Sequence, residues 1–169
     1  MRGEPRSGCA INAGVEALGD PWSVIVLRDM MFGDRRYFRE LLTGSDEGIA
    51  SNVLSSRLKA LVAGGLLTRD DAARGQRARY SLTEAGIQTL PVLVALGTWG
   101  RAHRETTPEL TIRQQLMEEG GPTMVAELMD ELRAHHLGTP LPPSEGPRAS
   151  ERLRTAYEKV VAARTSAQG

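Results

Sequence analysis

The sequence predicts a mostly helical α+β fold, in which one two-stranded β-hairpin lies among helices and a further helical region follows. Aromatic residues make up only 4% of the chain, so the core must be built from aliphatic side chains and methionine, which favours helices over a β-sandwich. Apolar residues recur at helical spacing over most of the 169 residues. This period changes once, between residues 66 and 82, where two short strand-like runs flank a polar turn.

Two helices are expected in the first part of the chain. Residues 9–18 place Ile11, Val15 and Leu18 on one helix face, and a glycine follows. Asp20 is a suitable N-cap for the next helix, with a proline at its first position. Residues 22–32 are apolar on nearly all sides, which predicts a central buried helix that stops at Gly33.

A helix-turn-helix and a hairpin are expected next. Residues 37–43 form a short helix, 44–48 a turn, and 51–63 a longer helix that ends at two glycines. Residues 66–70 and 79–82 are the strands of a β-hairpin with a protruding polar tip. A helix from Thr83 to about His103 follows, bent or split at Pro91. This order of elements is typical of a winged helix-turn-helix domain.

The C-terminal region has a different character. Residues 109–119, 123–137 and 150–163 are predicted helices, and four prolines mark 138–147 as a loop. Residues 1–104 contain 14 Lys and Arg against 11 Asp and Glu, whereas 105–169 contain 7 against 10. We therefore expect two parts: a winged helix-turn-helix DNA-binding domain with dimerisation helices over 1–104, and a helical extension over 105–169 for dimerisation or an effector.

Several functional classes are disfavoured by composition. No run of 18 apolar residues is present, which excludes a membrane span and predicts a cytoplasmic protein. The single cysteine excludes an intramolecular disulfide and a multi-cysteine zinc site. No phosphate-binding loop, metal-ligand cluster or nucleophile elbow is found, so we expect no catalytic residues, no metal, no cofactor and no enzyme activity.

Four motifs in order resemble the HxlR family of winged-helix regulators over residues 9–104. They are Gly19-Asp20-Pro21-Trp22 running into Leu27-Arg28-Asp29; Arg35 to Leu41; Val53 to Leu58 with Gly65-Leu66-Leu67; and Arg79 to Gly86, followed by Pro91-Val92-Leu93 and Trp99-Gly100. Cys9 stands where the family commonly has an N-terminal cysteine. The resemblance implies a homodimeric repressor or activator that binds double-stranded DNA at a palindromic operator.

The chain departs from this family pattern at several positions. Ala10 replaces the proline after the cysteine, and the predicted wing tip has no proline. Ala50 and Ser51 stand where the family has a capping serine and a proline, so the cap of the recognition helix is expected to shift to Ser51. About 65 residues continue past the point where many family members end.

The resemblance also implies which residues contact DNA. Small polar side chains at the start of residues 51–63 suit base edges in the major groove, and the surrounding cations suit phosphates. The expected set is Arg35, Arg36, Arg39, Ser51, Asn52, Ser55, Ser56, Arg57, Lys59, Arg74, Arg77 and Arg79. The polar residues could instead form a solvated helix face, Arg57 could be an internal ion-pair partner, and Arg79 could form a cross-strand pair.

Dimerisation and sensing complete the expectations. Apolar residues of the first helix and of the helix after the wing offer a dimer interface, although each could face the core: Ile11, Val15, Leu93, Leu96 and Trp99. Cys9 is a redox-sensing candidate or a small apolar residue. Methionines of the extension, such as Met117 and Met124, line either a pocket for a small-molecule effector or a core. The alternative function is a protein-interaction module on a winged-helix scaffold without DNA binding.

Overall fold

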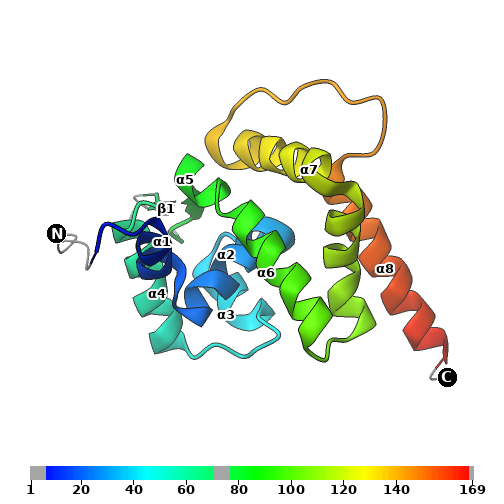
Figure 1. Ribbon diagram of the computed structural model, residues 1–169, viewed down its shortest axis with the longest axis horizontal. Coiled ribbons are helices and arrows are strands. Elements are labelled where there is room, and N and C mark those ends of the chain that lie inside the picture. The colour runs from blue at the N-terminus through cyan, green and yellow to red at the C-terminus, as the bar shows by residue number, and fades with distance from the viewer. Residues whose placement is uncertain (1–6, 71–76, 168–169) are drawn as a thin grey trace. The chain divides into compact units, whose positions relative to one another are not determined.

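The computed structural model describes residues 7–70 and 77–167, and the chain divides into two compact units, 1–87 and 88–169. The first unit contains the elements expected of a winged helix-turn-helix (Figure 1). They are α1 (Ala10–Leu18), α2 (Pro21–Gly33), α3 (Phe38–Gly44), α4 (Ser51–Ala63), β1 (Leu67–Arg69), β2 (Tyr80–Leu82) and α5 (Glu84–Ile87). Arg74 lies outside the described residues.

Helix α2 is the central element of the first unit, as predicted. Asp20 caps it, because the carboxylate Oδ1 accepts a hydrogen bond from the Ser23 backbone N–H at 2.9 Å, and Pro21 follows in the first turn. Val26, Leu27 and Met30 are almost fully buried. The helix ends at Gly33, and Asp34 follows in the left-handed region with φ 49°. Aspartate enters that region more readily than most residues.

Helix α4 packs against α2, α3 and β1 through one buried stripe. Leu54, Leu58 and Leu61, three and four residues apart, are each no more than 2% exposed. The expected shift of the cap to Ser51 is wrong: Ala50 occupies the N-cap position and no side chain caps the helix. The alanine side chain has no hydrogen-bonding group. It therefore cannot accept a hydrogen bond from the backbone N–H groups in the first turn of α4.

The wing hairpin is antiparallel, with Leu67 opposite Leu82 and Arg69 opposite Tyr80. The segment before α3 extends it, since Tyr37 forms an isolated bridge with Arg79 and the Tyr80 N–H donates to the Arg36 carbonyl at 2.8 Å. The sequence pattern did not predict this third strand-like segment, because one bridged residue has no periodicity. It anchors the base of the wing to the start of the helix-turn-helix.

The second unit consists of α6 (Leu90–His103), α7 (Pro108–Leu137) and α8 (Ala149–Ala167). The helix expected from Thr83 is split between Ile87 and Leu90, and Pro91 lies in the first turn of α6. Helix α6 packs on α7, and α7 packs on α8. The two helices expected around the Gly-Gly-Pro sequence are present as the two halves of α7, separated by a kink at Gly121, which adopts a non-helical conformation with φ 57° and ψ −151° that suits glycine.

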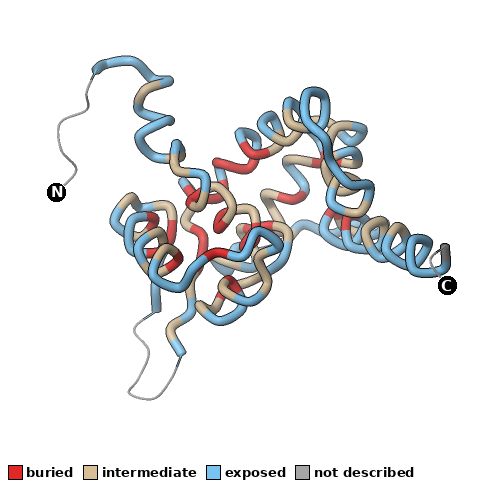
Figure 2. Tube along the Cα trace, turned by 90° about the horizontal axis from the view of Figure 1, so that it is seen from below, coloured by how far each residue is buried: buried red, intermediate tan, exposed pale blue. Residues whose placement is uncertain are grey.

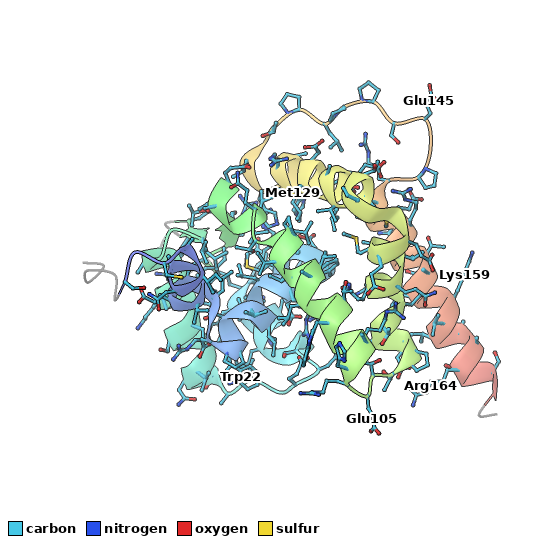
Figure 3. The ribbon with its side chains drawn as sticks, viewed as in Figure 1. Trp22, Glu105, Met129, Glu145, Lys159 and Arg164 are labelled. Carbon is cyan, nitrogen blue, oxygen red and sulfur yellow. The ribbon has the colours of Figure 1, made fainter. Side chains whose placement is uncertain are left out.

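The core of the second unit is aliphatic and rich in methionine. Met117 and Met124, which were predicted to line a pocket or a core, are buried together with Leu128 and Leu132. Helix α8 adds Ala149 and Leu153 to the buried residues. Its remaining links to α7 are largely polar: ion pairs Arg164–Glu109 and Arg152–Glu127, and the Arg113 guanidinium over the Tyr157 ring at 4.3 Å. Arg164 and Lys159 mark this polar C-terminal half of α8 in Figure 3.

Helix α1 differs from the other long helices because none of its residues is buried (Figure 2). Ile11 and Val15 are 78% and 58% exposed. None of the helices in the described ranges combines the length and apolar character needed to cross a membrane.

Candidate nucleic-acid interface

The face of α4 opposite its leucines is polar and exposed. Ser51, Asn52, Ser56 and Lys59 are exposed, and Ser55 is half-buried. Helix α3 and the turn 45–50 precede α4, and the buried Ile49 holds the end of this turn against the core. The arrangement projects small hydrogen-bonding side chains from the first two turns of a helix, which is the geometry that enters a major groove.

A buried carboxylate determines how this helix-turn-helix is held. Asp29 in α2 is only 4% exposed. Its Oδ1 accepts hydrogen bonds from Nε and Nη2 of Arg28 at 3.0 and 2.7 Å. Its Oδ2 lies 3.0 Å from Nη1 of Arg35, which stands in the connection between α2 and α3. A buried charge is tolerated when it is paired and hydrogen-bonded, as here.

Arg35 therefore has a structural position, although the sequence suggested a phosphate contact. Its guanidinium passes over Gly44, the last residue of α3, and over Gly33, the last residue of α2. A Cβ at position 44 would overlap the Arg35 Nε. The two glycines thus leave room for an arginine that joins the ends of two helices at one carboxylate.

Arg28 extends the same network to the turn before α4. Its Nη1 and Nη2 donate to the two carboxylate oxygens of Glu47 at 2.5 and 2.8 Å. The hydrogen bonds from Arg28 lower the pKa of Glu47 to about 2. Ser45 Oγ also donates to Glu47, at 3.1 Å. The turn between α3 and α4 is thereby tied to α2 by a bidentate ion pair.

Arg36, a second predicted phosphate contact, is 7% exposed and faces the wing. Its Nε donates to the Tyr80 carbonyl at 3.2 Å, and its Nη2 donates to Ser81 Oγ. Burial lowers the pKa of Arg36, and the neighbouring charge of Arg79 adds to this effect. Arg36 holds strand β2 against the segment that leads into α3.

Arg57 and Arg79 each have an ion-pair partner within the protein, which was one of the two alternatives that the sequence left open for them. Arg57 Nη1 lies 3.3 Å from Asp20 Oδ2, and Arg79 Nε lies 3.2 Å from Asp70 Oδ2. Both pairs are partly exposed. Such partly exposed pairs contribute little to stability.

The remaining cations of the interface are exposed and carry no ion pair to a described residue: Arg39 on α3, Lys59 on α4, and Arg69 and Arg77 on the wing. Arg69 was missed in the sequence, although it occupies an exposed position on β1. Its place at the end of β1, where the chain enters the polar tip of the hairpin, was the signal that could have identified it. Within the described ranges, no three His, Cys, Asp or Glu side chains are grouped as metal ligands would be.

Comparison with known proteins agrees with this geometry. The family model described as HxlR-like helix-turn-helix matches residues 17–108. An HTH-type transcriptional regulator of Mycobacterium tuberculosis, Rv3095, is 32% identical over 115 residues, which are 66% of this chain and 71% of the relative. The HTH-type transcriptional regulator sll1512 of Synechocystis is 34% identical over 93 residues, which are 54% of this chain and 67% of the relative.

Solved structures show the same fold. PA1607, a candidate transcription factor, superposes with a TM-score of 0.54 at 30% identity, over 61% of this chain and 70% of its own. A MarR-family regulator from Porphyromonas gingivalis superposes with a TM-score of 0.50 over 60% of this chain and 99% of its own, and at 22% identity it supports the fold alone.

The Arg28–Glu47 pair gives a pH-dependent prediction. Because the pKa of Glu47 is depressed from 4.5 to about 2, its contribution to stability is present above pH 4.5 and is lost as the pH falls towards 2. We expect Glu47→Gln to lower the free energy of unfolding by about 1 kcal/mol at pH 7, since solvent screens this partly exposed pair. Urea denaturation at pH 7, 4 and 3 measures the effect.

Asp46→Asn is the matched control for this prediction, because Asp46 is an exposed carboxylate in the same turn with no ion pair to a described residue. Its effect on unfolding should be small at each pH. If Glu47→Gln lowered the free energy of unfolding by the same amount at pH 7 and at pH 3, the Arg28–Glu47 pair would not be the source of this stability.

Proposed function

The chain belongs to the HxlR-like helix-turn-helix family and is a transcriptional regulator; we propose that it acts as a homodimer that binds duplex DNA sequence-specifically and represses transcription. The observation that carries the proposal is the exposed polar face of α4, on a helix-turn-helix held by the Asp29 network. Asn52 is suited to bidentate pairing with adenine, and the adjacent serines to several bases. Bound over a promoter, such a dimer would exclude the transcription machinery.

The cations divide into two groups under this proposal. Arg39, Lys59, Arg69 and Arg77 are exposed and suited to phosphates or, on the wing, to the minor groove. Arg35 and Arg36 act inside the domain, where they hold α3 and β2 in position. Arg74 remains a wing contact predicted from sequence.

DNA binding is tested by fluorescence anisotropy with the upstream region of the protein's own gene and a scrambled duplex, each over a salt series. We expect tight binding to the upstream duplex only. Asn52→Ala should reduce the preference for that duplex by about tenfold, because it removes a base contact. Lys59→Ala should weaken binding to both duplexes equally and reduce the salt slope by about one, because it removes a phosphate contact.

The alternative, an interaction module without DNA binding, predicts a different outcome. Both duplexes would bind equally weakly, and neither substitution in α4 would change the result. A tight protein partner would then have to be sought.

Homodimerisation is supported by apolar residues left exposed on α6. Leu96 and Trp99 are 54% and 51% exposed. Val92, which was not among the predicted interface residues, is 52% exposed on the same helix. Leu93, also expected at the interface, is 8% exposed. Ile11 and Val15 on α1 offer a second exposed apolar surface. Two-fold symmetry would pair two half-sites in a palindromic operator.

Leu96→Glu is expected to convert the dimer to a monomer, because it places a charge in the apolar surface. Analytical ultracentrifugation measures the mass, and Lys159→Glu on the polar side of α8 serves as the control. A monomeric wild-type protein, or a Leu96→Glu variant that remains dimeric, would exclude this interface.

Regulation by thiol chemistry or by a small molecule is the last part of the proposal. Cys9 is exposed at the N-cap of α1, so reagents have access to its sulfur. We expect a peroxide or an electrophile to release DNA from the wild-type protein and not from Cys9→Ser, as measured by anisotropy. Release from both proteins would favour the small-molecule effector over the thiol.

A further inference from the structure

Asp20 lies at the junction of α1 and α2, and its two carboxylate oxygens have different partners. Oδ1 accepts hydrogen bonds from the Ser23 backbone N–H and hydroxyl at 2.9 and 3.2 Å, which caps α2. Oδ2 lies 3.3 Å from Nη1 of Arg57, on α4. Capping requires only an oxygen acceptor, whereas the interaction with Arg57 requires the negative charge. The two roles can therefore be separated by substitution.

Arg57 lies on the flank of α4, between the polar face and the buried leucine stripe. It follows Ser56 and precedes the buried Leu58, and 34% of its side chain is exposed. A guanidinium carries five N–H donors in a planar fork. Among the described residues, Asp20 is the ion-pair partner of Arg57, and the buried Arg57 Nε has no hydrogen bond.

The contrast with Arg28 shows how incompletely Arg57 is satisfied. Arg28 donates four hydrogen bonds, two to Asp29 and two to Glu47. Arg57 has one ion pair to a described residue, at 3.3 Å. A phosphate would accept two parallel hydrogen bonds from a guanidinium, which is the stronger arrangement.

We propose that Asp20 is an internal counter-ion that holds Arg57 back from the DNA backbone and thereby lowers the affinity of the protein for every duplex. The proposal rests on the proposed function, because it concerns how strongly the same α4 surface attaches to DNA. Phosphate contacts carry no sequence information, so withholding one cation weakens cognate and unrelated duplexes alike. Discrimination then stays with the polar side chains of α4. Asp20 acts through Arg57 and is a positioning residue.

The test uses the full chain with Asp20→Asn, whose amide oxygen still caps α2. Release of Arg57 should tighten binding to both the upstream and the scrambled duplex by about three- to fivefold. The salt slope should steepen by about one on each duplex, because one more phosphate is neutralised. Arg57→Gln alone should leave the slope unchanged, and the double variant should lose the gain.

Two controls separate this effect from general charge and from folding. Asp46→Asn removes the same charge from the turn before α4 and should leave the slope unchanged. If Asp20→Asn unfolds at a lower temperature than the wild-type protein, Asp20→Ser is used in its place, because serine also provides a capping oxygen.

The outcomes distinguish this inference from the proposed function. Elution from heparin, a polyanion without sequence, should shift to higher salt for Asp20→Asn and return in the double variant, even if the upstream duplex is not recognised. A wild-type protein that does not distinguish the duplexes counts against the proposed function alone. A salt slope already reduced by Arg57→Gln, or a gain that persists in the double variant, overturns the role of Asp20.

Discussion

The carboxylate of Asp29 is the constraint on which the recognition surface depends. It is buried in α2, and its two oxygens are held by arginines from the same helix and from the connection to α3. One of them, Arg28, continues to Glu47 in the turn before α4. A single buried charge thus joins the central helix to both connections of the helix-turn-helix. Removing it would leave Arg28 and Arg35 without their buried partner, which is more damaging than losing a surface ion pair.

This network explains why the outer face of α4 is open to carry function. The inner face is held by Leu54, Leu58 and Leu61, and the approach to the helix is held by the ion pairs around Asp29. No residue of the outer face is needed for either task. Ser51, Asn52 and Ser56 are exposed, and within the part of the chain that the structure describes no side-chain hydrogen bond competes for their polar groups. A recognition helix held in this way loses little further freedom when it binds.

The order of the helices and the hairpin could be predicted because each has a periodic signal. The bounds of α4, the cap at Asp20 and the split before Pro91 follow from local rules, and the structure confirms them. The roles of Arg35 and Arg36 could not be predicted, and for Arg57 the sequence offered the internal ion pair only as one of two alternatives. Their partners Asp29, Ser81 and Asp20 are close in space only after folding, and a surface arginine and a buried one have the same local sequence pattern. The bridge of Tyr37 to Arg79 was missed for the same reason.

The internal use of arginine changes how the charge of this chain should be interpreted. Residues 1–104 have a mild basic excess, but Arg28, Arg35 and Arg36 are held within the first unit, and Arg57 and Arg79 are paired at its surface. A smaller set of exposed cations, including Arg39 and Lys59, remains available to phosphates. Since non-specific affinity rises with each phosphate neutralised, a domain that uses its arginines internally binds unrelated DNA less tightly. Under the proposed function, recognition then depends correspondingly more on the base contacts proposed for α4.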